Sequence, residues 1–126
     1  MSLRSPLGRV LGLGSAKNGT SHWWGQRVSA VALLLLGIWF AWMLATMSGF
    51  SHAEAAAFIA QPINSILLLL LTASMAYHSH LGIQVVIEDY VHAPGVKMFS
   101  LLLSRFAHVL LAVAAIYAIF KIGLGA

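Results

Sequence analysis

The sequence predicts an all-α integral membrane protein with three transmembrane helices. Apolar residues are abundant, charged residues are scarce, and the apolar residues gather into three long runs. Of the 126 residues, 60% are hydrophobic and 8% are charged, whereas about 25% of the residues of a soluble domain are charged. Such a chain lacks the polar side chains that a water-facing surface needs, which excludes a soluble globular domain.

Each apolar run is long enough to cross the hydrocarbon core of a bilayer. The runs cover residues 28–47, 62–88 and 98–122, and a helix needs roughly 20 residues to cross a core of about 30 Å. We expect helices, because a backbone in lipid must satisfy its own hydrogen bonds and three strands cannot close a barrel.

Short links separate the runs. The first link covers residues 48–61 and ends before Pro62, and proline is favoured at the first position of a helix. The second link covers residues 89–97 and contains the turn pair Pro94-Gly95. Both links are predicted to lie outside the hydrocarbon core.

The basic residues predict an N-terminus in the cytoplasm. This orientation places Lys121 on the outer side and five basic residues on the cytoplasmic side, namely Arg4, Arg9, Lys17, Arg27 and Lys97. The opposite orientation inverts the ratio and violates the positive-inside rule. Residues 1–21 then form a cytoplasmic arm and residues 22–126 a membrane anchor. The topology also accounts for the net charge of +4. Nucleic-acid binding would instead require basic residues clustered on one face of a folded domain.

Histidines inside the apolar runs are candidates for a functional site, because ionisable groups within a membrane are costly. His78 lies about 16 Å from the cytoplasmic end of its helix, and His108 lies at a similar depth on the third helix. A neutral imidazole at this depth suits axial coordination of haem iron. Ser74 and Gly82, one turn to either side of His78, would leave space for a flat macrocycle. Alternatively, they form a small-residue helix contact and His78 hydrogen-bonds a neighbouring helix.

A second candidate site is the segment Glu88-Asp89-Tyr90 at the inner end of the second helix. A tyrosine hydroxyl can donate a hydrogen bond to a carbonyl, and a neighbouring carboxylate can renew its proton from water. This arrangement suits a quinone head group. The alternative is that these residues simply mark the end of a membrane span.

The segment from His78 to His92 resembles the signature of the cytochrome b-type membrane anchors of succinate dehydrogenase (respiratory complex II), the smaller of its hydrophobic subunits. The pattern is a histidine, a glycine four residues later and an Asp-Tyr pair after eleven residues, here His78, Gly82, Asp89 and Tyr90. The segment 22–30 is similar to the region that opens the first helix in bacterial members. The resemblance covers nearly the whole chain.

The resemblance implies roles for individual residues. His78 would be one axial ligand of haem b, and Tyr90 would donate a hydrogen bond to ubiquinone with Asp89 beside it. Arg27 would pair with a haem propionate through bidentate hydrogen bonds or serve only as a positive-inside anchor. The resemblance assigns no role to Ser29.

The resemblance also implies partners and a location. A second three-helix anchor subunit would supply the other haem ligand, an iron–sulfur subunit would dock on both anchors, and a flavoprotein subunit would oxidise succinate. The chain would catalyse no reaction alone. It would lie in the bacterial inner membrane, with the quinone site on the cytoplasmic side.

Two alternatives remain. In a fumarate reductase or a self-contained di-haem cytochrome, His78 and His108 would both bind haem within one chain. In a small transporter, these two histidines and His80 would form a relay. His80 points about 200° away from His78 on a helix, and we interpret His80 and His108 as structural.

Overall fold

The computed structural model describes residues 19–125, which form four helices. The helices are α2 (Gly19–Thr46), α3 (His52–Ala60), α4 (Pro62–Tyr90) and α5 (Pro94–Gly123). Three of them, α2, α4 and α5, are long and apolar enough to cross a membrane. The described part of the chain contains no strand, and the predicted all-α membrane fold is confirmed.

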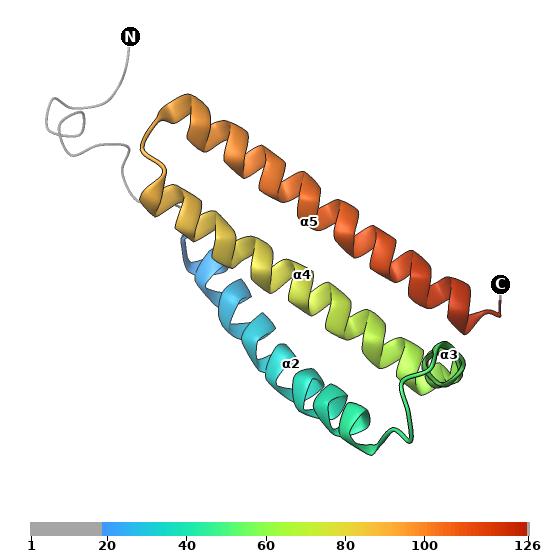
Figure 1. The fold of residues 1–126 in the computed structure, drawn as a ribbon. Helices are drawn as coiled ribbons and strands as arrows, with labels where there is room; N and C mark the ends of the chain where they lie inside the picture. The colour runs from blue at the N-terminus through green and yellow to red at the C-terminus, as the bar shows by residue number, and fades with distance from the viewer. Residues whose placement is uncertain (1–18, 126) are drawn as a thin grey trace, which may run out of the picture.

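The central helix of the bundle is α4 (Figure 1). It packs against α2 on one side and α5 on the other, whereas α2 and α5 make no contact within residues 19–125. The short α3 contacts α4 and α5. Because the long helices alternate in direction, the start of α2, the end of α4 and the start of α5 share one end of the bundle. The helix α3 lies at the opposite end (Figure 1).

The long helices extend beyond the predicted apolar runs. The helix α2 begins at Gly19, nine residues earlier than predicted, and α5 begins at Pro94, four residues earlier. An apolar run marks the residues that suit the hydrocarbon core, while helical hydrogen bonding continues into the headgroup layer. Pro94 therefore starts a helix instead of forming a turn, as its missing N–H allows. Most of the predicted arm lies outside the described residues, and residues 19–21 belong to α2.

The first link contains the helix α3, which was not predicted. Its start is a capping box. The Ser51 Oγ accepts a hydrogen bond from the Glu54 backbone N–H at 3.3 Å, and the Glu54 carboxylate accepts one from the Ser51 backbone N–H at 2.9 Å. This reciprocal pair satisfies two N–H groups at the helix start.

The corner between α3 and α4 is fixed by polar side chains. The Asn64 Nδ2 donates to the Phe58 carbonyl at 3.0 Å and to the Gln61 Oε1 at 3.2 Å, and Asn64 is buried. The Ser65 hydroxyl donates to the Ile59 carbonyl. These bonds satisfy backbone groups at the end of α3.

Few side chains are buried within the described part of the chain. The buried set is Leu81, Ile119, Ser29 and Asn64, and large apolar side chains remain exposed along all three long helices. An outer surface of this kind suits lipid or partner helices instead of water. The bundle consequently has almost no apolar core of its own.

Candidate functional site

His78 lies on the side of α4 that faces α2, where two polar side chains contact its ring. The Ser29 Oγ is 3.0 Å from His78 Nδ1, and the Gln26 Nε2 is 3.3 Å from His78 Nε2. Gln26 and Ser29 are three residues apart and therefore share one face of α2. The predicted candidate ligand thus lies at a helix contact, with both ring nitrogens near polar atoms of the same neighbouring helix.

The two contacts select the same tautomer of His78, as assigned from the hydrogen-bonding partners. The Ser29 hydroxyl donates to the Gly25 carbonyl at 2.7 Å, so its oxygen is an acceptor toward Nδ1. The Gln26 amide nitrogen can only donate, so Nε2 is the acceptor in the other contact. The proton of the neutral ring accordingly sits on Nδ1, and the lone pair on Nε2 is opposed by a single side-chain amide.

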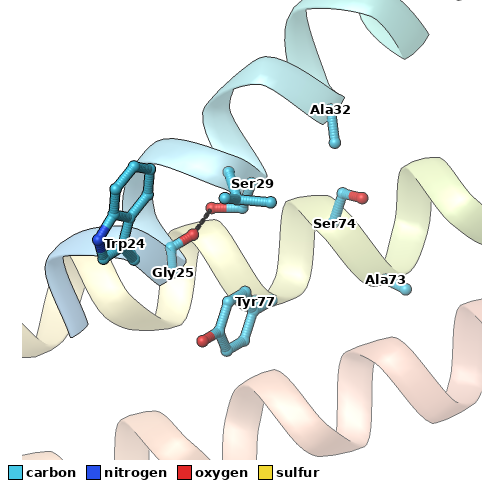
Figure 2. A pocket seen from close by; sticks show the side chains of 8 residues that line it. Trp24, Gly25, Ser29, Ala32, Ala73, Ser74 and Tyr77 are labelled. Carbon is cyan, nitrogen blue, oxygen red and sulfur yellow. Dashed lines mark hydrogen bonds between the residues drawn. The ribbon is translucent and has the colours of Figure 1, made fainter. Parts of the chain in front are cut away.

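Grooves flank this helix contact on two sides. One groove, of about 500 Å³, is lined by Trp24, Ser29, Ser74 and Tyr77 among others (Figure 2). A second groove, of about 380 Å³, is lined by His22, Trp23, Gln26, Arg27, Gly82 and Val85. The predicted small-residue face is therefore divided between two grooves, with Ser74 in the first and Gly82 in the second.

Arg27 lies in the second groove, beside the amide that contacts His78. Its guanidinium carbon is 5.4 Å from the centre of the Trp23 ring, within the range of a cation–π contact. Arg27 makes no ion pair within the described residues, and its side chain is exposed. Arg27 and Gly82, both singled out from the sequence, thus line one groove. Gln26 lines it as well and connects it to His78.

Asp89 and Tyr90 lie at the end of α4, and both are exposed. The Tyr90 side chain is 78% exposed. Within residues 19–125, neither the Tyr90 hydroxyl nor the Asp89 carboxylate makes a hydrogen bond, whereas Lys97 Nζ donates to the Glu88 carbonyl at 2.7 Å. Tyr90 is about 18 Å along the helix axis from His78. Within the described part of the chain, Asp89 and Tyr90 therefore lie at an exposed helix end.

His108 belongs to a separate polar cluster between α4 and α5. Its Nδ1 donates to the Ser104 carbonyl at 2.7 Å, and its Nε2 accepts from the Ser79 hydroxyl at 3.1 Å. The His80 ring centre lies 5.6 Å from that of His108. Both ring nitrogens of His108 therefore have hydrogen-bonding partners inside the chain.

Sequence reasoning missed Arg105, which lies on α5 eleven residues after Pro94. It lines a groove of about 440 Å³ together with Tyr77, His80 and His108. The signal was present in the sequence, because a charge inside an apolar run is costly and deserves explanation. Gln26 and Ser29 were missed as partners of His78, and their role depends on which helix lies against α4.

Within residues 19–125, no group of three or more His, Cys, Asp or Glu side chains could hold a metal ion. The haem and quinone roles of His78, Asp89, Tyr90 and Arg27 stay predictions at this point.

Comparisons with known proteins identify the family. The family described as succinate dehydrogenase/fumarate reductase transmembrane subunit matches residues 1–120. The chain is 32% identical over 120 residues to a succinate dehydrogenase hydrophobic membrane anchor subunit from Rickettsia bellii (strain RML369-C), covering 95% of this chain and 96% of that one. It is 33% identical over 122 residues to the subunit of the same name from Paracoccus denitrificans, covering 97% and 94%. The chain therefore belongs to this family, as a non-catalytic membrane-anchor subunit of succinate dehydrogenase.

Proposed function

We propose that this chain holds one axial ligand of haem b and forms part of the ubiquinone-reduction site of a succinate:ubiquinone oxidoreductase. The haem assignment rests on the environment of His78. The imidazole lies within a helix long and apolar enough to span a membrane, its Nδ1 has a partner in Ser29, and among the described residues its Nε2 faces the Gln26 amide. Rotation of that flexible side chain would free the Nε2 lone pair for iron.

Two residues near His78 support haem binding by their size and charge. Gly82 carries no side chain, and a Cβ added there would already lie in van der Waals contact with the Gln26 Nε2, at 3.6 Å. Arg27 lines the same groove as Gly82 and would pair with a propionate through two parallel hydrogen bonds. The second axial histidine would come from the other anchor subunit. When bound, the haem supplies a centre that accepts and returns one electron.

Tyr90 and Asp89 would act on ubiquinone at the cytoplasmic end of α4. The Tyr90 hydroxyl would donate a hydrogen bond to a quinone carbonyl, and the Asp89 carboxylate would hold a proton path from water. Both side chains are exposed, so the pocket would be completed by the second anchor and the iron–sulfur subunit. The flavoprotein subunit would oxidise succinate on the same side of the inner membrane.

The family includes fumarate reductase subunits, which leaves the working direction as an alternative. A di-haem anchor would need His108 as a ligand, although both of its nitrogens already have partners. A transporter relay would need the three histidines to lie in one continuous series, whereas His78 contacts α2 and the other two meet between α4 and α5. Both arrangements favour a single haem ligand at His78.

Haem content separates the three histidines. In the purified four-subunit complex, we expect His78→Ala to lose haem relative to flavin, and His80→Ala and His108→Ala to retain it. Loss of haem in His108→Ala would instead favour the di-haem anchor. Full haem content in all three variants would contradict haem ligation by this chain.

The quinone role is tested by separating quinone reduction from succinate oxidation. We expect Tyr90→Phe to lower ubiquinone reduction roughly tenfold, as the loss of about 1.4 kcal/mol of hydrogen bonding implies. Succinate oxidation with a soluble electron acceptor should stay unchanged. Tyr117→Phe is the control, because Tyr117 is an exposed tyrosine of α5 toward the opposite end. Equal ubiquinone reduction in wild type and Tyr90→Phe would rule out the role of Tyr90.

A further inference from the structure

Ser29 is the one described residue that contacts the Nδ1 side of His78, the side that would point away from iron. We infer that Ser29 is a positioning residue for the haem: it accepts the Nδ1–H of His78, fixes the ring orientation and increases electron donation from Nε2. This inference rests on the proposed function, because it concerns the ligand of the proposed haem.

A chain of two hydrogen bonds carries the inference. His78 Nδ1–H donates to the Ser29 Oγ at 3.0 Å, and the Ser29 hydroxyl donates to the Gly25 carbonyl at 2.7 Å. Ser29 is only 6% exposed, so neither bond competes with water. Successive hydrogen bonds polarise one another in a low-dielectric interior, and each bond therefore strengthens the other.

A purely local role accounts for only part of this geometry. Serine in a membrane helix commonly donates to the carbonyl four residues earlier, and the bond to Gly25 is of that kind. That bond would exist without any neighbouring helix. It does not explain why the buried Ser29 oxygen lies within hydrogen-bonding distance of His78, the candidate ligand on the neighbouring helix α4.

A hydrogen bond at Nδ1 changes the ligand as well as its orientation. Metal-bound histidines usually donate their other ring N–H to an acceptor, which fixes the tautomer and raises ligand basicity. A more basic imidazole stabilises ferric iron more than ferrous iron. Removing the acceptor should therefore raise the midpoint potential of the haem. If ferric binding weakens tenfold more than ferrous binding, the rise is about 59 mV.

The test compares Ser29→Ala with Ser29→Thr in the purified four-subunit complex. Threonine keeps the hydroxyl acceptor, and alanine removes it. Ser79→Ala is a matched control, because the Ser79 Oγ contacts His108 Nε2 at 3.1 Å and His108 is not a proposed ligand. The measurements are the haem-to-flavin ratio, the midpoint potential from a redox titration, and the electron paramagnetic resonance spectrum of ferric haem.

We expect Ser29→Ala to raise the potential and change the ferric spectrum, with Ser29→Thr and Ser79→Ala remaining near wild type. If Ser29→Ala cannot retain haem, a wild-type potential in Ser29→Thr supports the inference, and haem loss in Ser29→Thr as well contradicts it. An unchanged potential in Ser29→Ala also overturns the inference, yet leaves haem ligation intact. Haem retained in His78→Ala would instead overturn the proposed function.

Discussion

At the residue scale, the contact between His78 and α2 depends on how closely two helices approach. Gly25 lies where α2 meets α4. A Cβ at this position would come 2.6 Å from the Tyr77 hydroxyl and 3.2 Å from the Leu81 Cδ1. The missing side chain allows the approach that places Ser29 3.0 Å from the imidazole.

We therefore expect Gly25→Val to separate the helices and disturb the His78 site. Overpacking of this kind costs about 1–3 kcal/mol, and it should lower haem retention in the purified complex as well as resistance to unfolding by denaturing detergent. Gly37→Val is the control on the same helix, since nothing lies within 4 Å of a Cβ there. Equal haem retention in the two variants would contradict the importance of the close approach.

Single residues were predicted from the sequence when their chemistry was unusual for their place in the chain. His78 was identified because an imidazole is costly in an apolar run. Arg105 carried the same signal and was overlooked. The role of Ser29 could not be predicted, because a serine in a helix is ordinary and its contact joins residues 49 positions apart. Only the packing of α2 on α4 brings this serine to His78.

At the element scale, α3 depends on its capping box. The side-chain and backbone hydrogen bonds from Ser51 hold the pKa of Glu54 below its ordinary value of 4.5. Because the folded pKa is lowered, the stabilisation is complete above the ordinary pKa and is lost as the pH falls through the folded pKa. The start of α3 should therefore loosen in acid and remain intact at neutral pH.

Amide hydrogen exchange over residues 52–60 measures this effect. We expect exchange, corrected for its intrinsic pH dependence, to speed up below about pH 4.5 in the wild type. Ser51→Ala should cost roughly 1 kcal/mol of local stability and should weaken the pH dependence, because the bond from the Ser51 hydroxyl is lost. A pH dependence identical to that of the wild type would contradict the proposed role of the Ser51 hydroxyl.

The corner between α3 and α4 gives a second prediction at this scale. Asn64→Leu should destabilise the corner by about 1–3 kcal/mol, because the Phe58 carbonyl loses the hydrogen bond from the buried Asn64 side chain. Gln84→Leu is a matched control, since its amide donates to the exposed Glu88 carboxylate and its loss should have little effect. Thermal unfolding in detergent compares the two variants. An equally small change in both would argue against the corner bonds.

The existence of the three long helices followed from hydropathy, while their ends did not. Hydropathy falls at His22, Gln26 and Arg27, but helical hydrogen bonds continue through them. The interfacial first turns of α2 and α5 were consequently missed. The Ser-x-x-Glu pattern at the start of α3 is present in the sequence. Because the helix is short, it was predicted as part of the first link.

At the scale of the whole molecule, three spans and an exposed apolar surface define a multi-pass membrane protein. The cytoplasmic N-terminus remains a prediction from basic residues. The chain has no cysteine, so a single introduced cysteine reports its own side of the membrane. With an impermeant maleimide applied from outside, we expect Phe50→Cys to react and His92→Cys to be protected. The reverse pattern would invert the topology and place Tyr90 on the outer side.

The family and the three-span architecture could be predicted because they depend on local composition and one spaced motif. The arrangement of α4 between α2 and α5 could not, because each helix is apolar on most of its surface and hydropathy distinguishes no face. The proposed second haem ligand and the remaining walls of the proposed quinone pocket would belong to other subunits, so the sequence of this chain could not predict them.

The central claim is that His78 is the haem ligand of this chain, and the most direct test is a reduced-minus-oxidised visible spectrum of the purified complex. Wild type and His78→Ala are measured at equal flavin content. We predict a b-type signal in the wild type that disappears or broadens in the variant, because the Nε2 ligand is gone. An unchanged b-type signal in His78→Ala would contradict the account, and a wild type without haem would do so equally.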